Sequence, residues 1–184
     1  METKVKSQRL CYSFVGRLID EKGIPELLEA FILLPQENLT LAIVGNGACL
    51  HKYQNYCQEK KLDNVVFTGF KPEDELVKYY AAADIFVFPT RSDPWGLVLN
   101  EAMAVCLPIV CSTAAGAADD LIKDKVNGLI VPVGDVASLA KALQRLIINE
   151  NLRKQMGLQS RLIINDYTPE TMAQGFKEAI FSTK

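Results

Sequence analysis

Residues 84–104 read DIFVFPTRSDPWGLVLNEAMA, which places a strand, a loop and a helix in succession. Residues 84–88 form a short apolar run rich in β-formers, and such a run predicts a buried strand. Residues 97–105 are mostly good helix formers and lead to Leu107-Pro108, which predicts a helix that ends there. The loop between them follows the carboxyl end of a strand, which is where ligands bind in open α/β sheets.

This loop and the start of its helix combine two kinds of polar group. Asp93 lies in the loop, Glu101 lies one turn into the helix, and free backbone amides are expected at residues 96–98. Such amides attract anions, and carboxylates accept hydrogen bonds from hydroxyl groups. The combination suits a sugar attached to a phosphate. On the residues alone, Asp93 has a second interpretation as a turn-former before Pro94, and Glu101 has one as part of a solvated helix face.

The helical spacing of this segment predicts where Glu101 points. Leu97, Glu101 and Val105 recur every four residues, so they share one face of the predicted helix. We expect Leu97 to point inward or toward the loop, and Glu101 therefore to face the cleft.

The rest of the chain alternates between apolar runs and helical patterns. Further strands are predicted at residues 10–15, 39–44, 65–69, 108–112 and 129–132. Further helices are predicted after Pro25 and at residues 48–60, 72–83, 136–147, 153–166 and 168–181. This alternation predicts an α/β fold: a single Rossmann-like domain with a doubly wound parallel sheet of about six strands and helices on both faces.

The loop after the first predicted strand carries two cations, Arg17 and Lys22. In a parallel sheet this loop lies at the same edge as the Asp93 loop. Taken alone, these cations are best interpreted as surface partners of Asp20 and Glu21, because exposed charges are usually just solvated.

Composition limits the kinds of partner. The chain has 184 residues, which favours one domain of ordinary size. Lys and Arg number 20 against 22 Asp and Glu, so the net charge is −2. That balance argues against nucleic-acid binding and against a polybasic membrane surface. No apolar run approaches the roughly 18 residues that a membrane-spanning helix needs, and residues 1–6 lack the apolar core of a signal peptide.

Cysteine and histidine usage excludes some chemistry. The five cysteines are Cys11, Cys49, Cys57, Cys106 and Cys111. Their number is odd and no pair has CxxC spacing, so we expect free buried thiols in a reducing cytosol and no metal site. His51 is the one histidine, which excludes a mechanism that needs a histidine pair within this chain.

Residues 45–50, GNGACL, are similar to the first part of a dinucleotide-binding fingerprint. Leu50 stands where the third glycine belongs, and residues 65–68 supply no acidic residue for a ribose. A turn is therefore the default interpretation, with small residues that let the backbone approach a ligand closely.

Taken together, several stretches resemble one family in one order. They are GRL at 16–18 with EKG at 21–23, VGNG at 44–47, VFTG at 66–69, YAAAD at 80–84 with FP at 88–89, DPWGLV at 93–98 with EAMA at 101–104, and NG at 127–128. Nearly the whole chain resembles the C-terminal, nucleotide-sugar-binding half of the retaining glycosyltransferases of family 4, group 1, which have the GT-B fold. As a set these motifs are specific; singly, only residues 93–103 would be.

The resemblance implies how a donor diphosphate would be held. Arg17 and Lys22 match the basic pair that binds the diphosphate and steadies its charge as it departs. Leu97 and Val98, after Gly96, match positions whose backbone amides meet phosphate. Fixed cations and a helix N-terminus can stabilise growing negative charge without a metal, so no metal and no cofactor are expected, only the nucleoside-diphosphate sugar as substrate.

The resemblance also implies roles toward the sugar, the ribose and the base. Glu101 matches the family glutamate that hydrogen-bonds the ribose hydroxyls. Asp93 stands where the family has another glutamate, near the hydroxyls of the transferred sugar, and is one methylene shorter. Phe70 falls near the nucleobase region, and Gly16 and Gly47 belong to the donor-binding stretches. Retention of configuration by front-face attack is likewise what the resemblance implies.

Members of the resembled family carry an acceptor-binding Rossmann-like domain before this one. Residues 1–184 begin almost at the first strand of the donor half. We therefore expect the N-terminal acceptor domain to be absent here, in a fragment, a truncated product or one subunit of a split enzyme. Alone, the chain is expected to bind a nucleoside diphosphate weakly and to transfer no sugar.

Three functions stay open from the sequence. The first is the donor half of a sugar transferase that uses UDP or GDP sugars in surface polysaccharide or lipopolysaccharide synthesis, in the cytoplasm or peripherally at the inner membrane through the missing half. The second is a non-catalytic partner subunit, for which the Asp93 change is the one hint. The third is a nicotinamide-dependent Rossmann oxidoreductase, against which the incomplete fingerprint argues.

Overall fold

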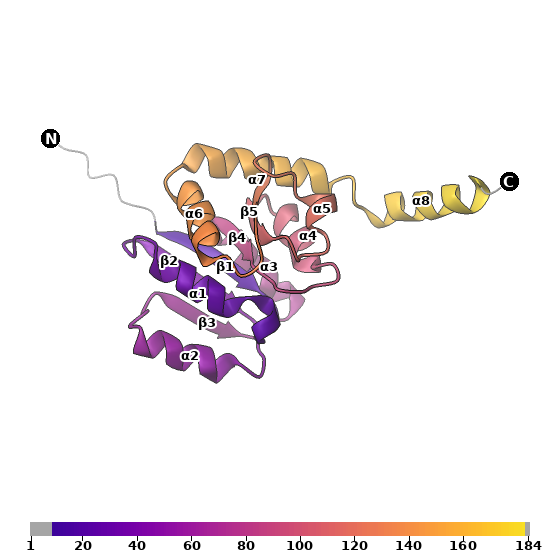
Figure 1. The fold of residues 1–184 in the computed structure, drawn as a ribbon. Coiled ribbons are helices and arrows are strands. Elements are labelled where there is room, and N and C mark those ends of the chain that lie inside the picture. The colour runs from indigo at the N-terminus through magenta and orange to yellow at the C-terminus, as the bar shows by residue number, and fades with distance from the viewer. Residues whose placement is uncertain (1–8, 183–184) are drawn as a thin grey trace.

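A computed structural model describes residues 9–182 of the chain (Figure 1). Six parallel strands form one sheet in the order β3-β2-β1-β4-β5-β6. The strands are β1 (Leu10–Val15), β2 (Leu39–Val44), β3 (Val65–Gly69), β4 (Ile85–Phe88), β5 (Ile109–Ser112) and β6 (Gly128–Val131). The predicted doubly wound parallel sheet is confirmed.

Helices flank this sheet (Figure 1). They are α1 (Ile24–Ile32), α2 (Leu50–Glu59), α3 (Glu73–Ala81), α4 (Leu97–Ala104), α5 (Ala118–Leu121), α6 (Val136–Ile147), α7 (Glu150–Ile164) and α8 (Pro169–Ser182). A 3₁₀ turn, η1 (Asp20–Lys22), precedes α1. Helix α1 packs on α6 and α4 packs on α7, while α8 extends away from the body of the domain.

The core lies along the middle strands. Every residue of β4 and β5 is buried, because both faces of these strands are covered. Phe86 and Phe88 of β4 stack with their ring centroids 6.5 Å apart, and the ring of Phe88 also stacks on that of Phe14 in β1. The central strands are therefore a rigid base for the loops that leave their carboxyl ends.

Some local predictions are corrected. The helix predicted from residue 153 begins at Glu150, because the side chain of Asn149 accepts a hydrogen bond from the amide of Leu152 and caps it. Cys57 and Cys111 are buried as expected. Cys106 is exposed, however; it lies two residues beyond the end of α4.

Among residues 9–182 there is no helix with both the length and the apolar character required to cross a bilayer.

Strand order decides which loops meet. Strands β1 and β4 are neighbours although β2 and β3 lie between them in the chain, so the strand order reverses at this pair. The loops after β1 and β4 consequently leave the same edge side by side, at the point where ligands bind in such sheets. The β2 loop also approaches: a Cβ on Gly45 would lie 1.9 Å from the carbonyl oxygen of Gly16.

The close approach at Gly45 leads to a stability prediction. Gly45 has a φ of 138°, and the atom that its Cβ would meet belongs to the backbone. We expect Gly45→Ala to lower the free energy of unfolding by more than about 2 kcal/mol, because both strain and overlap must be relieved. Urea unfolding followed by circular dichroism measures it.

Gly175→Ala is the matched control for this substitution. Nothing lies within 4 Å of the Cβ position of this glycine in α8, so its stability should be unchanged or slightly higher. Equal stability of the two variants would contradict the tight β1–β2 loop packing.

Candidate functional site

The loop after β1 places Lys22 beside the loop after β4. Turn η1 is followed by Gly23, whose φ is 70° and whose amide donates to the carbonyl of Asp20. A Cβ on Gly23 would lie 1.9 Å from the carbonyl oxygen of Pro89, so a glycine is needed where the two loops touch. This contact brings Lys22, at the end of η1, against the residues that follow Pro89.

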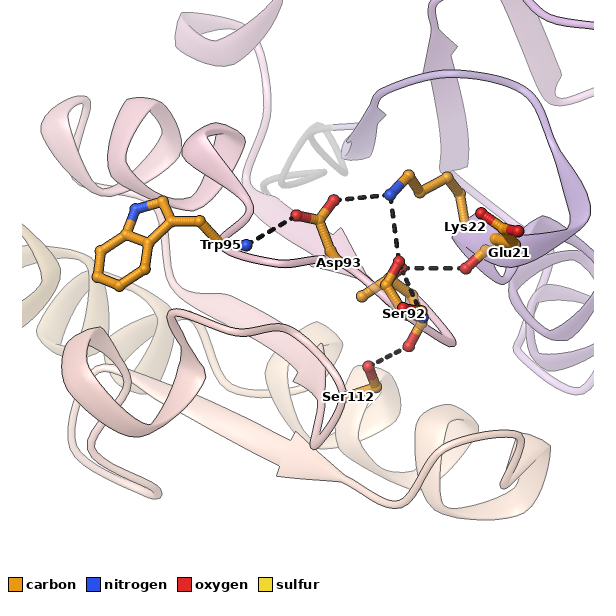
Figure 2. A network of polar contacts seen from close by, with 7 residues as sticks. Glu21, Lys22, Ser92, Asp93, Trp95 and Ser112 are labelled. Carbon is orange, nitrogen blue, oxygen red and sulfur yellow. Dashed lines mark hydrogen bonds and ion pairs between the residues drawn. The ribbon is translucent and has the colours of Figure 1, made fainter.

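An ion pair joins the two loops (Figure 2). The Lys22 ammonium lies 2.7 Å from Oδ2 of Asp93 and donates to the carbonyl of Ser92 at 3.3 Å. The exposed fractions of the two side chains are 9% and 17%. The pair is therefore largely removed from water, and loss of either partner would leave a desolvated charge.

Asp93 is also fixed within its own loop. Its Oδ1 accepts a hydrogen bond from the amide of Trp95 at 3.1 Å, which closes an Asx turn around Pro94. Its backbone bridges to Ala115 in the loop after β5: its amide donates to the carbonyl of Ala114, and its carbonyl accepts from the amide of Gly116. Three loops thus meet at Asp93.

Thr90 links the loop after β1 to the loop after β4, and the sequence patterns did not predict this role. The Thr90 hydroxyl is within hydrogen-bonding distance of the carbonyl oxygens of Glu21 and Ser92, at 3.0 and 2.9 Å, and its own carbonyl accepts from the Ser112 hydroxyl. Thr90 is completely buried and Ser112 nearly so. The available signal was a hydroxyl residue at the end of each apolar run: Thr90 follows β4 after Pro89, and Ser112 is the last residue of β5.

A second ion pair joins the loop after β4 to α1. Arg91 contacts Oε1 of Glu26 at 2.6 Å, and the Arg91 amide donates to the carbonyl of Glu21 at 2.7 Å. Glu26 is buried, and hydrogen bonding raises the pKa of the Arg91 guanidinium further. Sequence patterns gave no reason to pair residues so far apart.

The start of α4 presents free backbone donors. Gly96 precedes the helix with a φ of 90°, no side chain caps it, and within residues 9–182 the amides of Leu97 and Val98 donate to no acceptor. Such amides attract anions. Of the two directions expected for Leu97, inward is wrong: this side chain is 67% exposed at the first position of the helix, while Val98 is half-buried.

Glu101 is exposed and oriented by a neighbouring helix. Its Oε2 accepts a hydrogen bond from the hydroxyl of Tyr80 in α3 at 2.5 Å. Tyr80 is 2% exposed, and burial, followed by this hydrogen bond and the charge of Glu101, raises the pKa of its hydroxyl far above the usual range. The Glu101 carboxylate therefore has one oxygen held and the other available.

A hollow of about 260 Å³ lies beside the ends of β1, β2 and β3. Gly16, Arg17 and Phe70 line it together with Lys71, so three predicted donor-binding residues meet there. Phe70 is 74% exposed. Gly47 lies at the same edge, where a Cβ would come within 2.4 Å of the Leu18 carbonyl oxygen.

The predicted residues thus fall into two neighbouring groups at the carboxyl edge of the sheet. Lys22 and Asp93 are joined directly, and the start of α4 follows Asp93 in the chain; Arg17 and Phe70 line the hollow. The expected surface pairing of Lys22 with Asp20 or Glu21 is wrong. Asp20 instead pairs with Lys52 at 2.8 Å and accepts from Tyr53, and these hydrogen bonds lower the pKa of Asp20.

Arg17 remains exposed. Within the described part of the chain it makes no ion pair, which leaves its guanidinium able to bind an anion.

Known proteins share both the sequence pattern and this architecture. Residues 2–162 match the family model of the glycosyl transferases group 1. The chain belongs to that family. Membership argues against the nicotinamide-dependent oxidoreductase considered from the sequence.

Relatives in this family show where it works. The chain is 36% identical over 143 residues to the uncharacterised glycosyltransferase MJ1607 of Methanocaldococcus jannaschii, covering 77% of the chain and 36% of the relative. It is 35% identical over 141 residues to the amylovoran biosynthesis glycosyltransferase AmsK of Erwinia amylovora, covering 72% of the chain and 34% of AmsK. Relatives work in capsule, exopolysaccharide and O-antigen synthesis. The chain spans about a third to two fifths of the length of these relatives.

Solved structures agree with the fold. The C-terminal domain of the group 1 glycosyl transferase LpcC from Francisella tularensis superposes with a TM-score of 0.80 at 25% identity, covering 88% of each chain. Anabaena HepE in complex with UDP superposes with a TM-score of 0.79 at 25% identity, covering 95% of this chain and 49% of HepE. The fold is that of the C-terminal half of the family's GT-B enzymes.

The Tyr80–Glu101 contact leads to a pH prediction. The pKa of Tyr80 is raised in the folded protein, so folding favours its protonated form. The resulting stability is fully present below the unfolded pKa of about 10 and is lost as pH rises above it. The free energy of unfolding should therefore fall above pH about 10, and Tyr80→Phe should reduce the slope by about 1.4 kcal/mol per pH unit.

Urea unfolding at pH 8 to 11.5 measures this slope, and Tyr167→Phe is the matched control. Tyr167 is exposed, and its hydroxyl donates to a backbone carbonyl instead of a carboxylate. An unchanged slope in Tyr80→Phe would contradict the burial of a neutral Tyr80.

Proposed function

We propose that residues 1–184 are the donor-binding half of a retaining glycosyltransferase, which moves a sugar from a nucleoside-diphosphate sugar to an acceptor in surface polysaccharide or lipopolysaccharide synthesis. The observation that carries the proposal is the meeting of a buried ammonium, Lys22, with the loop that leads into the free amides of α4. The family and the settings in which relatives work support it.

The proposed roles follow from charge and position. Lys22, the exposed Arg17 and the amides of Leu97 and Val98 would bind the diphosphate and stabilise the negative charge that grows on it as the sugar leaves. Glu101, held at one oxygen by Tyr80, would accept hydrogen bonds from ribose hydroxyls with the other.

The hollow at the ends of β1 to β3 is the proposed base site. Phe70 offers an aromatic surface for stacking, and Gly16 lets the backbone line the floor. Because HepE is described in complex with UDP and with UDP and glucose, uracil is the first base to test.

Calorimetric titration of the chain with UDP, GDP, ADP and NAD tests the function. We expect one nucleoside diphosphate to bind. Lys22→Met, which keeps the packed stem of the side chain, should weaken it at least about tenfold by removing a charge-assisted hydrogen bond.

Lys154→Met is the matched control, because Lys154 forms an exposed pair with Glu150 in α7, and it should bind like the wild type. Binding of no nucleotide would contradict the proposal and favour a non-catalytic partner subunit. Binding of NAD alone would contradict both.

The share of the relatives that the chain spans leads to an activity prediction. The chain covers 34% of AmsK and 42% of the capsular glycosyltransferase CapM of Staphylococcus aureus. We expect these 184 residues alone to bind a nucleotide sugar without transferring its sugar, because both relatives are more than twice as long as the part that the chain covers. Release of UDP or GDP in the presence of candidate acceptors measures transfer, and turnover by the purified chain would overturn this expectation.

A further inference from the structure

We infer, resting on the proposed function, that Asp93 is the resident counter-anion of Lys22. The donor's diphosphate competes with its carboxylate for the ammonium, so Asp93 weakens diphosphate binding. Its role is toward the phosphates through Lys22, and not toward the hydroxyls of the transferred sugar.

Both oxygens of the Asp93 carboxylate are already engaged. Oδ2 lies 2.7 Å from the Lys22 ammonium, and Oδ1 accepts from the amide of Trp95 at 3.1 Å. The second contact belongs to an Asx turn, which needs a side chain as short as that of aspartate or asparagine. The carboxylate is thereby tied down within its own loop and faces the cation (Figure 2).

The Lys22 ammonium has one N–H donor more than its partners within the site use. An ammonium has three N–H donors, and Asp93 and the carbonyl of Ser92 accept from it. One donor is left for a phosphate oxygen. With 2.7 Å on one side and a hydrogen bond of about 3 Å on the other, that oxygen lies at most about 6 Å from the carboxylate.

Like charges at this separation repel strongly in a site with little water. A diphosphate that binds Lys22 must therefore share the ammonium with a repelling carboxylate or displace it. In the empty site, the same carboxylate neutralises an ammonium that is largely buried. Asp93 thus holds the Lys22 ammonium in place between turnovers, and it favours release of the nucleoside diphosphate after transfer.

The test is Asp93→Asn, which keeps the shape of the side chain and its ability to form the Asx turn but removes the charge. We expect inorganic pyrophosphate and UDP to bind about tenfold more tightly by calorimetry. UDP-glucose should tighten by the same factor as UDP, because the effect does not involve the sugar. The melting temperature of the free variant should fall, while the rise produced by saturating UDP should grow.

Asp63→Asn is the matched control, since Asp63 is exposed at the opposite edge of the sheet, just before β3, and its loss changes the net charge equally. It should leave both affinities within about twofold, because distant exposed charges are screened. If Asp93→Asn does not fold, Asp93→Ser provides the same charge change with a hydroxyl that can close a similar turn.

Three results would overturn the inference. Weaker binding of UDP-glucose with UDP unchanged would place Asp93 on the sugar. Weaker or unchanged binding of UDP and pyrophosphate together would show that Asp93 does not compete for Lys22. If neither wild type nor variant binds these three probes, GDP or ADP, the proposed function fails as well; if the wild type binds UDP normally, only the inference fails.

Discussion

The buried ion pair between Lys22 and Asp93 is the interaction on which the candidate site depends. Its partners are separated by 71 positions in the chain, and they meet because β1 and β4 are neighbours where the strand order reverses. A desolvated ammonium without a counter-anion would be costly, so neither loop can move without exposing or stranding a charge. The strand order therefore decides where the Lys22 ammonium lies, and the ion pair holds it there.

The surrounding hydrogen bonds make this geometry rigid. Thr90 links η1 to the β4 loop, Ser112 links that loop to β5, and Arg91 ties it to Glu26 in α1. Most acceptors in these hydrogen bonds are backbone carbonyls. The bonds therefore satisfy carbonyl groups that would otherwise be buried without partners. Groups that stabilise a developing charge are most effective when they are fixed beforehand. The hydrogen bonds of Thr90, Ser112 and Arg91 supply that preorganisation.

Much of the fold could be predicted from the sequence. The six strands are short apolar runs that end in glycine, proline or polar residues, and the helices between them carry periodic apolar stripes, so alternation alone indicates a parallel sheet. The edge shared by the Lys22 and Asp93 loops follows from that topology. What the pattern could not give was the partner of each charge: Lys22 has Asp20 and Glu21 beside it in sequence, yet it pairs with Asp93. The pairing of charges depends on side-chain direction and burial, which the adjacent residues in the sequence do not determine.

A crystal structure of the chain soaked with UDP is the sharpest test of its nucleotide-binding role. We expect a diphosphate oxygen within hydrogen-bonding distance of the Lys22 ammonium and of a Leu97 or Val98 amide, with the ribose against Glu101 and the base in the hollow lined by Arg17 and Phe70. A nucleotide bound elsewhere on the domain, with its diphosphate out of reach of Lys22, would contradict it.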